Sequence, residues 1–339
     1  MQLKLFCNIG ILKIKDFLIY LSSIYKVNYK IQNDPEVDIV FLWVDGDDPA
    51  HKKKKNLYLK NEINIQPIED KAIKEYRWSN NDEIIIALRS VEVFCPWVRK
   101  IWIITDKQTP RLDTLNNEFI KKINIVDHED IFSGYGNLLP VFNSLAIETF
   151  LWRIKDLTEN FIYLNDDMFL LKPVSKKDFF IAGKPIIRGG YKTYNKKELT
   201  LHHNVVRNGA LITGFESNYF FKQGHAPYVM NKSQMEELFN LYKDSFEKNS
   251  QYKFRSREQF NTVSLFYHKS IADSHYIINF YKDYMHLSEA ACKNLTRDEL
   301  TNKLDKIKNK KIKFICINDL GALKTKVPDF FKYLPEELS

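Results

Sequence analysis

Several apolar runs in this sequence end at an aspartate, and this pattern constrains the fold more than any other feature. The runs are VDIVFLWV before Asp45, IWIIT before Asp106, INIV before Asp127, FIYLN before Asp166 and FICIN before Asp319. Short runs rich in Val, Ile, Phe, Trp and Tyr are typical of buried strands. Each run therefore predicts a strand that delivers a carboxylate at its end.

Helix signals lie between these strands. The stretch NNDEIIIALRSVEVF has Asn80 as its predicted N-cap and Glu83 three residues later, and SQMEELFNLY opens with a predicted capping box of Ser233 and Glu236. Alternating strands and helices favour an α/β domain with a mostly parallel sheet and flanking helices. Ligands of such sheets bind beyond the carboxyl ends of the strands, so we expect the aspartates along one rim. Any single one of them could instead serve a turn or a helix cap.

The length and composition permit a large core and favour an anionic partner. With 339 residues and 44% hydrophobic residues, the chain can form one large domain or two closely joined ones. The net charge of +8 favours nucleotide phosphates, acidic glycans, anionic membranes or nucleic acid as partners. The four cysteines form no CxxC pair, which favours a reducing compartment.

Two basic stretches are set apart from this pattern. Residues 1–36 are apolar and mildly basic, but charged residues interrupt the roughly 20 apolar residues that a membrane span requires. They also contain no clear signal-peptide cleavage site. The pattern predicts an amphipathic helix that lies on the protein's own core or, alternatively, on a membrane. The run HKKKK at 51–55 predicts a solvated helix face that could also attract phosphate.

The adjacent pair Asp166 and Asp167 is a candidate magnesium site. Mg²⁺ commonly takes one or two protein carboxylates together with substrate phosphates and water. Neighbouring side chains on an extended strand point to opposite faces, so both can bind one ion only where the chain has turned. Otherwise one is the ligand and the other supports it. Taken alone, such a pair is more often a turn and a cap.

A second group of candidate residues lies further along the chain. His225 in QGHAPYVMNKS can accept a proton near neutral pH, and Arg255 and Arg257 in KFRSREQFN can bind phosphate oxygens. A lone histidine is more often structural than catalytic. The sequence has no GxxxxGK[ST], GxGxxG, GxSxG or HExxH motif, so any nucleotide is held by other means.

Taken together, these blocks resemble the Stealth family of sugar-1-phosphate transferases, which includes bacterial capsule polymerases and the catalytic subunit of the lysosomal-enzyme GlcNAc-1-phosphotransferase. The resemblance covers residues 37–339. Its blocks are DIVFLWVDGDDPAH, then RWSNNDEIIIALRSVEVFCPWVRKIWIITDKQTP through INIVDHEDIF to NFIYLNDDMFLLKPV, then GHAPYVMNKS with FRSREQFN, and finally FICIND. Four blocks in the same order are far more specific than any one of them.

The resemblance implies a phosphotransferase whose catalytic domain spans 37–339 and has a nucleotide-sugar-binding core like that of A-type glycosyltransferases. It implies transfer of a sugar-1-phosphate from a nucleotide-diphosphate sugar, expected to be a UDP-N-acetylhexosamine, to a glycan hydroxyl. The product is a phosphodiester in capsular or surface polysaccharide, and nucleoside monophosphate is released. Mg²⁺ or Mn²⁺ is the expected cofactor. The alternative is a glycosyltransferase on the same core that releases nucleoside diphosphate.

The resemblance also implies roles for individual residues. His225 is the expected base toward the acceptor hydroxyl, and Arg255 is expected to bind phosphate. Where the family has an acidic pair after this arginine, this sequence has Glu258 and Gln259. The full expectation is catalytic roles for His225, Asp45, Asp167, Asp319 and Arg255, substrate binding by Gly46, Asp48, Asn81, Asp82, Glu83, Arg89 and Arg257, and metal binding by Asp166 and Asp167.

The expected partners follow from this chemistry. They are the nucleotide-sugar donor, a polysaccharide or oligosaccharide acceptor, and other capsule biosynthesis enzymes that complete a polymer repeat. The expected location is the cytoplasm, with peripheral contact at the inner face of the cytoplasmic membrane. A non-enzymatic alternative is a basic protein that binds nucleic acid or anionic glycan through HKKKK and the lysine-rich run at 303–313, but no nucleic-acid-binding motif is present, so nucleic acid is not an expected partner.

Overall fold

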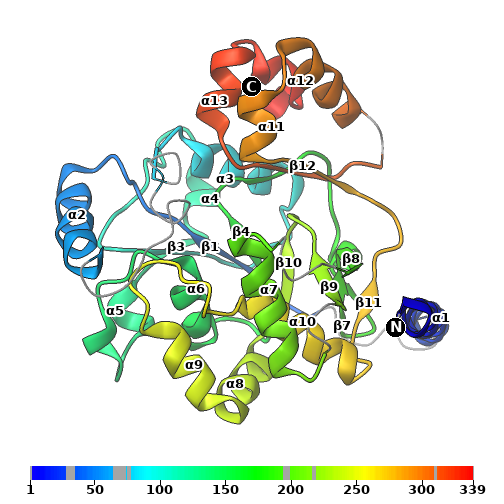
Figure 1. The fold of residues 1–339 in the computed structure, drawn as a ribbon. Helices are drawn as coiled ribbons and strands as arrows, with labels where there is room; N and C mark the ends of the chain where they lie inside the picture. Colours follow the sequence, from blue (N-terminus) through cyan, green and yellow to red (C-terminus); the bar gives the residue numbers. More distant parts are fainter. Residues whose placement is uncertain are drawn as a thin grey trace.

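The central element of the fold is a five-stranded sheet with the strand order β10-β4-β1-β2-β3 (Figure 1). The computed structural model describes residues 2–27, 35–63, 74, 78–193, 199–215, 219–308 and 311–338. Strands β4, β1, β2 and β3 are parallel, and β10 pairs antiparallel at the edge. The strands are β1 (Val37–Leu42), β2 (Ile101–Thr105), β3 (Ile123–Asp127), β4 (Asn160–Asn165) and β10 (Tyr228–Asn231). The predicted α/β class with a mostly parallel sheet is confirmed, and so is each predicted strand in it.

Helices lie around this sheet because its strands are apolar on both faces (Figure 1). The helices are α1 (Gln2–Val27), α2 (Pro49–Ile63), α3 (Glu83–Phe94), α4 (Asn117–Ile120), α5 (His128–Ile131), α6 (Ser144–Ile147), α7 (Leu201–Ile212), α8 (Lys232–Leu241), α9 (Lys243–Ser250), α10 (Thr262–Ala272), α11 (Glu289–Asn294), α12 (Arg297–Leu304) and α13 (Leu320–Lys326).

A second sheet brings the C-terminal part of the chain back to the end of β4. It has the order β12-β13-β5, and the Ile317 backbone N–H donates to the Asp167 carbonyl over 2.9 Å. The predicted strand at FICIN is β13, which is confirmed. The remaining strands are β5 (Met168–Leu170), β6 (Phe180–Ile181), β7 (Lys184–Ile187), β8 (Gly189–Thr193), β9 (Tyr219–Gln223), β11 (Ile277–Ile278), β12 (Tyr284–Leu287) and β13 (Phe314–Ile317).

The two predicted helix caps are wrong by two residues. Helix α3 starts after Asp82, because the Asn80 side chain accepts a hydrogen bond from the Asp82 N–H and holds the chain in a turn. The N-cap of α8 is Asn231, whose side chain accepts from the Gln234 N–H. The Ser233 hydroxyl is not available for capping, since it donates to Glu159.

The run at 51–55 is not simply a solvated face, which corrects that prediction. His51 and Lys55 at its two ends are buried. The Lys55 ammonium lies 4.3 Å from the centre of the Trp78 ring, and Lys54 forms an ion pair with Asp106. Three of the five residues of this run therefore pack α2 against the rest of the domain.

Helix α1 packs on the domain with one side only. Asp16 is buried and accepts a hydrogen bond from the Tyr276 hydroxyl, and the Lys15 ammonium donates to the Ile271 carbonyl over 3.0 Å. The expected packing on the core is confirmed for this side. No described helix is long and apolar enough to cross a bilayer. The end of the predicted 1–36 segment, at 28–34, lies outside the described residues.

Candidate active site

The pair Asp166 and Asp167 lies in the turn between β4 and β5, at the carboxyl end of the central parallel strands. Both residues are half-buried. The Asn318 amide donates from Nδ2 to Oδ2 of Asp167 over 2.7 Å, while Oδ1 of Asp167 is buried without a hydrogen-bond partner. The chain has turned at this pair, so the geometric condition for a shared ligand site is met.

The local electrostatics favour a cation at this turn. Burial, the neighbouring Asp167 and the carboxylate of Glu83 raise the pKa of Asp166 well above its usual range. Burial also raises the pKa of Asp167 to about 6. Three carboxyl groups that disfavour one another's ionisation, together with an unpartnered carboxylate oxygen, fit a hard divalent ion such as Mg²⁺.

Asn318 connects the aspartates to a histidine that sequence reasoning missed. Its Oδ1 accepts a hydrogen bond from Nε2 of His286. The opposite amide orientation would point Oδ1 at the Asp167 carboxylate, so the observed orientation is the favourable one. Nε2 of His286 must then carry a hydrogen. The expectation for this block was Asp319, but its neighbour Asn318 contacts Asp167.

His225 lies against the same histidine. The His225 and His286 rings stack with centroids 3.9 Å apart, and the His202 ring lies 5.2 Å from that of His225. The stack forms because Gly224 lies tightly against Tyr284, where a Cβ would come within 2.3 Å of the ring, and His286 follows two residues later on the same side of β12. Burial and these imidazoles lower the pKa of His225 to about 2, so His225 is neutral.

Cys316 completes a cluster with the two histidines. One ligand atom each of His225, His286 and Cys316 lies within 4.8 Å of the others. Burial and the neighbouring Asp167 raise the pKa of the Cys316 thiol well above its usual range. The thiol is therefore protonated in the metal-free site, and binding a metal there would require it to lose its proton.

Arg255 places a positive charge near Asp167. It donates to the Ser144 hydroxyl over 2.7 Å, and its charge lowers the pKa of both Asp167 and Glu148. Glu148 is buried, which raises its pKa to about 7, and it accepts from the Tyr163 hydroxyl over 3.1 Å. Sequence reasoning missed Glu148 because it lies in an otherwise apolar segment with no motif.

The loop after β1 is tightly built. Oδ1 of Asp45 accepts from the Asp47 N–H, and the Asp45 backbone exchanges two hydrogen bonds with the Gln108 amide. A Cβ at Gly46 would lie 2.0 Å from the Trp78 carbonyl, so only glycine fits. Asp48 caps the start of α2 by accepting from the His51 N–H over 2.8 Å.

The residues expected at the start of α3 do not all lie near the aspartates. Glu83 lies close enough for its charge to raise the pKa of both aspartates, and it accepts two hydrogen bonds from Asn81. Asp82 has a positive φ of 63° and pairs with Arg111 on the exposed surface. Glu83 is therefore the member of this group that the structure brings to the aspartates.

Three other expected residues have contacts elsewhere. Arg89 pairs with Glu92 and donates to the Glu337 carbonyl. Arg257 is exposed and donates to the Leu199 carbonyl, and Asp319 caps α13 by accepting from the Ala322 N–H. Their proposed roles at the substrate stay predictions.

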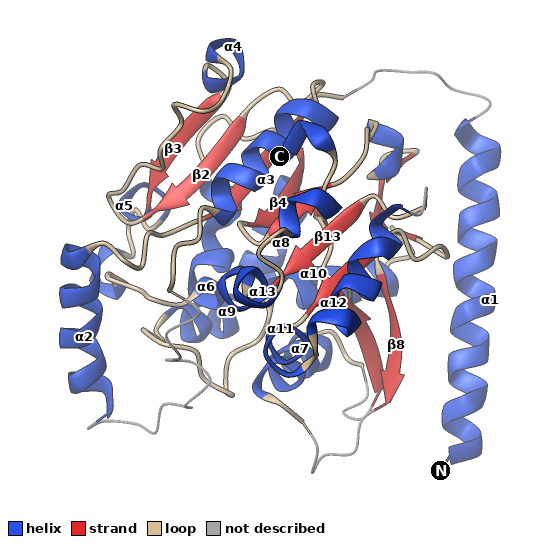
Figure 2. Cartoon of the chain, turned by 90° about the horizontal axis from the view of Figure 1, so that it is seen from above, coloured by secondary structure: helices blue, strands red, loops and turns tan. Residues whose placement is uncertain are grey.

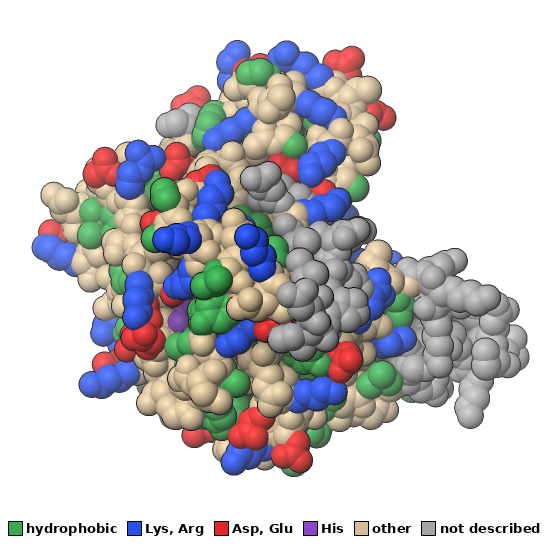
Figure 3. Space-filling view, turned by 60° about the vertical axis from the view of Figure 1, so that its left-hand side comes forward, with side chains coloured by type: hydrophobic (Ala, Val, Ile, Leu, Met, Phe, Trp, Pro, Cys, Tyr) green, Lys and Arg blue, Asp and Glu red, His purple; other side chains and the backbone are tan. Residues whose placement is uncertain are grey.

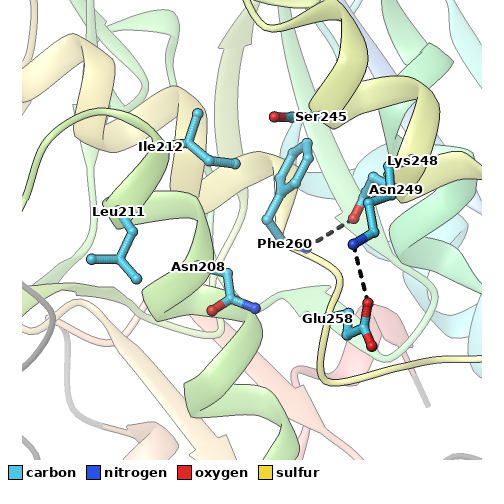
Figure 4. A pocket seen from close by; sticks show the side chains of 8 residues that line it. All are labelled: Asn208, Leu211, Ile212, Ser245, Lys248, Asn249, Glu258 and Phe260. Carbon is cyan, nitrogen blue, oxygen red and sulfur yellow. Dashed lines mark hydrogen bonds and ion pairs between the residues drawn. The ribbon is translucent and has the colours of Figure 1, made fainter.

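A small cavity of about 190 Å³ adjoins the loop that carries Arg257 (Figure 4). Its walls come from α7, α9 and the segment that leads into α10. An ion pair between Lys248 and Glu258 and a hydrogen bond from the Phe260 N–H to Asn249 lie on one side of it (Figure 4). Gln259 beside it is buried and bonded to Asn143 and Asn249, so it serves packing.

The sequence of this chain matches known protein families and individual relatives. Sequence models of Stealth protein conserved region 1 and conserved region 2 match residues 35–62 and 77–186. The capsular polysaccharide phosphotransferase WcwK of Streptococcus pneumoniae is 30% identical over 85% of this chain and 92% of its own length. The capsular polysaccharide phosphotransferase fcs1 of Haemophilus influenzae is 33% identical over 72% of this chain and 68% of its own.

Other similarities are more partial. An exopolysaccharide phosphotransferase of Streptomyces coelicolor is 32% identical over 68% of this chain, and this chain spans 39% of that relative. Among solved structures, the galactosyltransferase LgtC in complex with donor and acceptor sugar analogs aligns at 12% identity over 88% of this chain and 98% of its own, with a TM-score of 0.43. Because both Stealth conserved-region models match and WcwK is 30% identical over 92% of its own length, the chain belongs to the Stealth family.

Proposed function

We propose that this protein transfers a sugar-1-phosphate from a nucleotide-diphosphate sugar to a hydroxyl of a capsular or surface polysaccharide, forming a phosphodiester and releasing nucleoside monophosphate. The observation that carries the proposal is the convergence of Asp167, Asn318, His286 and His225 at the carboxyl end of β4. The names of the relatives, polysaccharide phosphotransferases of bacteria, support the same reaction class. The expected donor is a UDP-N-acetylhexosamine.

The residues divide the work of phosphoryl transfer. The acceptor oxygen forms a bond to the sugar-bearing phosphorus, and the bond from that phosphorus to the oxygen bridging to the nucleotide breaks. The hydroxyl proton passes to the neutral ring of His225. Arg255 is available to neutralise charge on the phosphate oxygens, and holding the reactants in line supplies much of the rate.

The low pKa of His225 belongs to the site without substrate. Burial and neighbouring imidazoles produce it. A diphosphate that lies nearby would favour the protonated ring and raise this pKa, because an opposite charge stabilises the charged form. His225 would then be a competent base only when the donor is bound.

Asp166 and Asp167 would hold the divalent cation, with the unpartnered Oδ1 of Asp167 as one ligand atom. The cation would neutralise charge on the diphosphate and stabilise the leaving nucleotide. Asn318 fixes the other oxygen of Asp167. We therefore expect EDTA to abolish turnover and Mg²⁺ or Mn²⁺ to restore it.

The proposed location is the cytoplasm at the inner face of the membrane, where nucleotide-sugar donors are available. We include a partner enzyme of capsule biosynthesis that adds the remainder of the polymer repeat. A purified chain that makes long polymer from one donor would contradict that part.

The test is to incubate the chain with Mg²⁺, a capsule-like acceptor and a panel of nucleotide sugars, and to identify the released nucleotide by ³¹P NMR. Nucleoside monophosphate is expected. Nucleoside diphosphate would mean ordinary glycosyl transfer. Full activity in both Asp167→Asn and His225→Ala would refute the residue assignment.

A further inference from the structure

The domain covers only one face of helix α1 and leaves the opposite, apolar face exposed. The inner face carries Asp16, Ser23 and the half-buried Ile19, which contact the domain. The opposite face carries a line of exposed apolar side chains at helical spacing. We call this line the apolar ridge; it consists of Ile11, Ile14, Phe17, Leu18 and Leu21, each between 47% and 64% exposed.

The ridge continues onto the body of the protein. The Phe280 ring makes edge contacts with the rings of Phe17 and Tyr20, at centroid distances of 6.4 Å and 5.5 Å. Phe280 and the adjoining Tyr281 are themselves about half or more exposed. Figure 2 shows α1 as a separate rod along one side of the molecule, so its outer side is open to solvent there.

An exposed apolar surface of this kind requires a partner. A surface helix of a soluble domain normally turns a polar face outward, and large contiguous apolar patches mark interaction sites. The inner face of α1 is fixed by the hydrogen bond between Asp16 and Tyr276, so the helix cannot simply rotate to bury the ridge.

The charges around the ridge identify the partner's chemistry. Within residues 10–23 and 279–283, both acidic side chains are buried: Asp16 against Tyr276 and Asp283 in an ion pair with Arg188. The exposed charged residues of these two stretches are Lys13 and Lys282. An apolar ridge flanked by lysines and aromatic rings is the pattern of a helix that lies in the interface of an anionic bilayer.

We propose that the apolar ridge docks the protein onto an anionic lipid surface, with the ridge and Phe280 entering the headgroup boundary and Lys13 and Lys282 contacting lipid phosphates. Because α1 is bonded to the domain through Asp16 and Lys15, docking would hold the catalytic domain in a fixed orientation at the membrane. The inference deepens the location given in the proposed function and rests on it for the biological membrane concerned.

The test is sedimentation of the full chain with vesicles, without donor or acceptor. We expect binding to vesicles of phosphatidylglycerol and phosphatidylethanolamine, and weaker binding to phosphatidylcholine. The double variant Ile14→Glu, Leu18→Glu should lose roughly tenfold or more of this affinity. The matched control Leu241→Glu, at another exposed leucine on α8, should bind as the wild type does.

The contribution of the two lysines and the insertion of the apolar ridge into the lipid are tested separately. The double variant Lys13→Glu, Lys282→Glu should bind anionic vesicles more weakly and lose the preference over neutral ones. In Leu18→Trp, the added fluorescence should shift to the blue with anionic vesicles, which reports insertion without a destabilising charge. Release of nucleoside monophosphate with a soluble acceptor should be unchanged in these variants, so docking and the proposed function can fail independently.

The proposal would be overturned by a wild type that binds no vesicles, by equal binding of the Ile14→Glu, Leu18→Glu variant, or by an unshifted spectrum for Leu18→Trp. A dimer in light scattering that this double variant turns into a monomer would also overturn it. In that case a second copy of the chain covers the ridge.

Discussion

At the scale of single residues, Asn318 is the side chain that joins the two halves of the site. Its amide donates to Asp167 and accepts from His286. Asn318→Ala should lower the rate of nucleoside monophosphate release roughly 10- to 100-fold, as loss of a residue that orients a metal ligand commonly does. Asn318→Asp should be at least as damaging, because it adds a carboxylate beside Asp167.

The control for Asn318 is Asn302→Ala, an exposed asparagine on α12. It should leave the rate unchanged. Wild-type turnover in Asn318→Asp would show that the hydrogen bond to Asp167 has no part in the reaction.

Gly46 should be sensitive for a steric reason. A methyl group there would overlap the Trp78 carbonyl, so Gly46→Ala must move the loop after β1 and should destabilise the protein by about 1–3 kcal/mol in urea unfolding. Gly190→Ala, whose Cβ would meet no atom within 4 Å, is the matched control. Equal midpoints for the two variants would contradict the close approach.

The sequence identifies individual candidate site residues, but it does not predict which of them contact one another. Asp166, Asp167 and His225 stand in recognisable blocks and the structure brings them into one connected group. His286 and Asn318 join them from segments that are distant in sequence, and their contacts depend on how β12 and β13 pack. No local pattern encodes such contacts.

At the scale of elements, two roles compete for Asp319: the cap of α13 and the catalytic role implied by the family resemblance. It caps α13, and Lys293 lies 3.4 Å from its other oxygen. Asp319→Ala should cost about 1 kcal/mol of stability, whereas Asp319→Asn keeps a capping oxygen and should cost less. If capping is its main role, turnover should follow stability in both variants.

A loss of turnover in Asp319→Asn at wild-type stability would instead support the catalytic role implied by the family resemblance. Thermal unfolding and nucleotide release measured on the same samples distinguish the two results.

Strands were predicted to within a residue or two, but helix starts were not. A buried strand is defined by a run of apolar residues, which is a local property. A helix start is decided by competition among neighbouring polar side chains, as at Asn80 and Ser233, which bond to Asp82 and Glu159 instead of capping.

At the scale of the whole molecule, Glu148 should make stability depend on pH. Its usual pKa of 4.5 is raised to about 7 by burial. Between these values the carboxyl is ionised in the unfolded chain and protonated in the folded one, so its contribution to stability falls as pH rises. The loss should reach about 3 kcal/mol above pH 7.

The Glu148→Gln variant should therefore show a flatter stability profile between pH 4.5 and 7 than the wild type. The control Glu236→Gln removes an exposed carboxyl and should leave the wild-type slope. Parallel profiles for wild type and Glu148→Gln in urea titrations would refute the shifted pKa.

The overall charge is weak evidence about partners at this scale. On the face seen in Figure 3, acidic and basic side chains are interspersed instead of gathering in one basic patch. The net charge of +8 predicted an anionic partner without identifying it, and the connected side chains at β4 carry the argument for a nucleotide sugar.

The return of β13 to the end of β4 has a consequence for synthesis of the protein. Asp167 meets Asn318 only after residues beyond 318 have left the ribosome, although the central sheet is nearly complete much earlier. A nascent chain would thus hold an unfinished candidate site, in which Asp167 lacks its hydrogen bond from Asn318, until β13 has packed against β5. Folding intermediates of this protein should be inactive even when most of the sheet has formed.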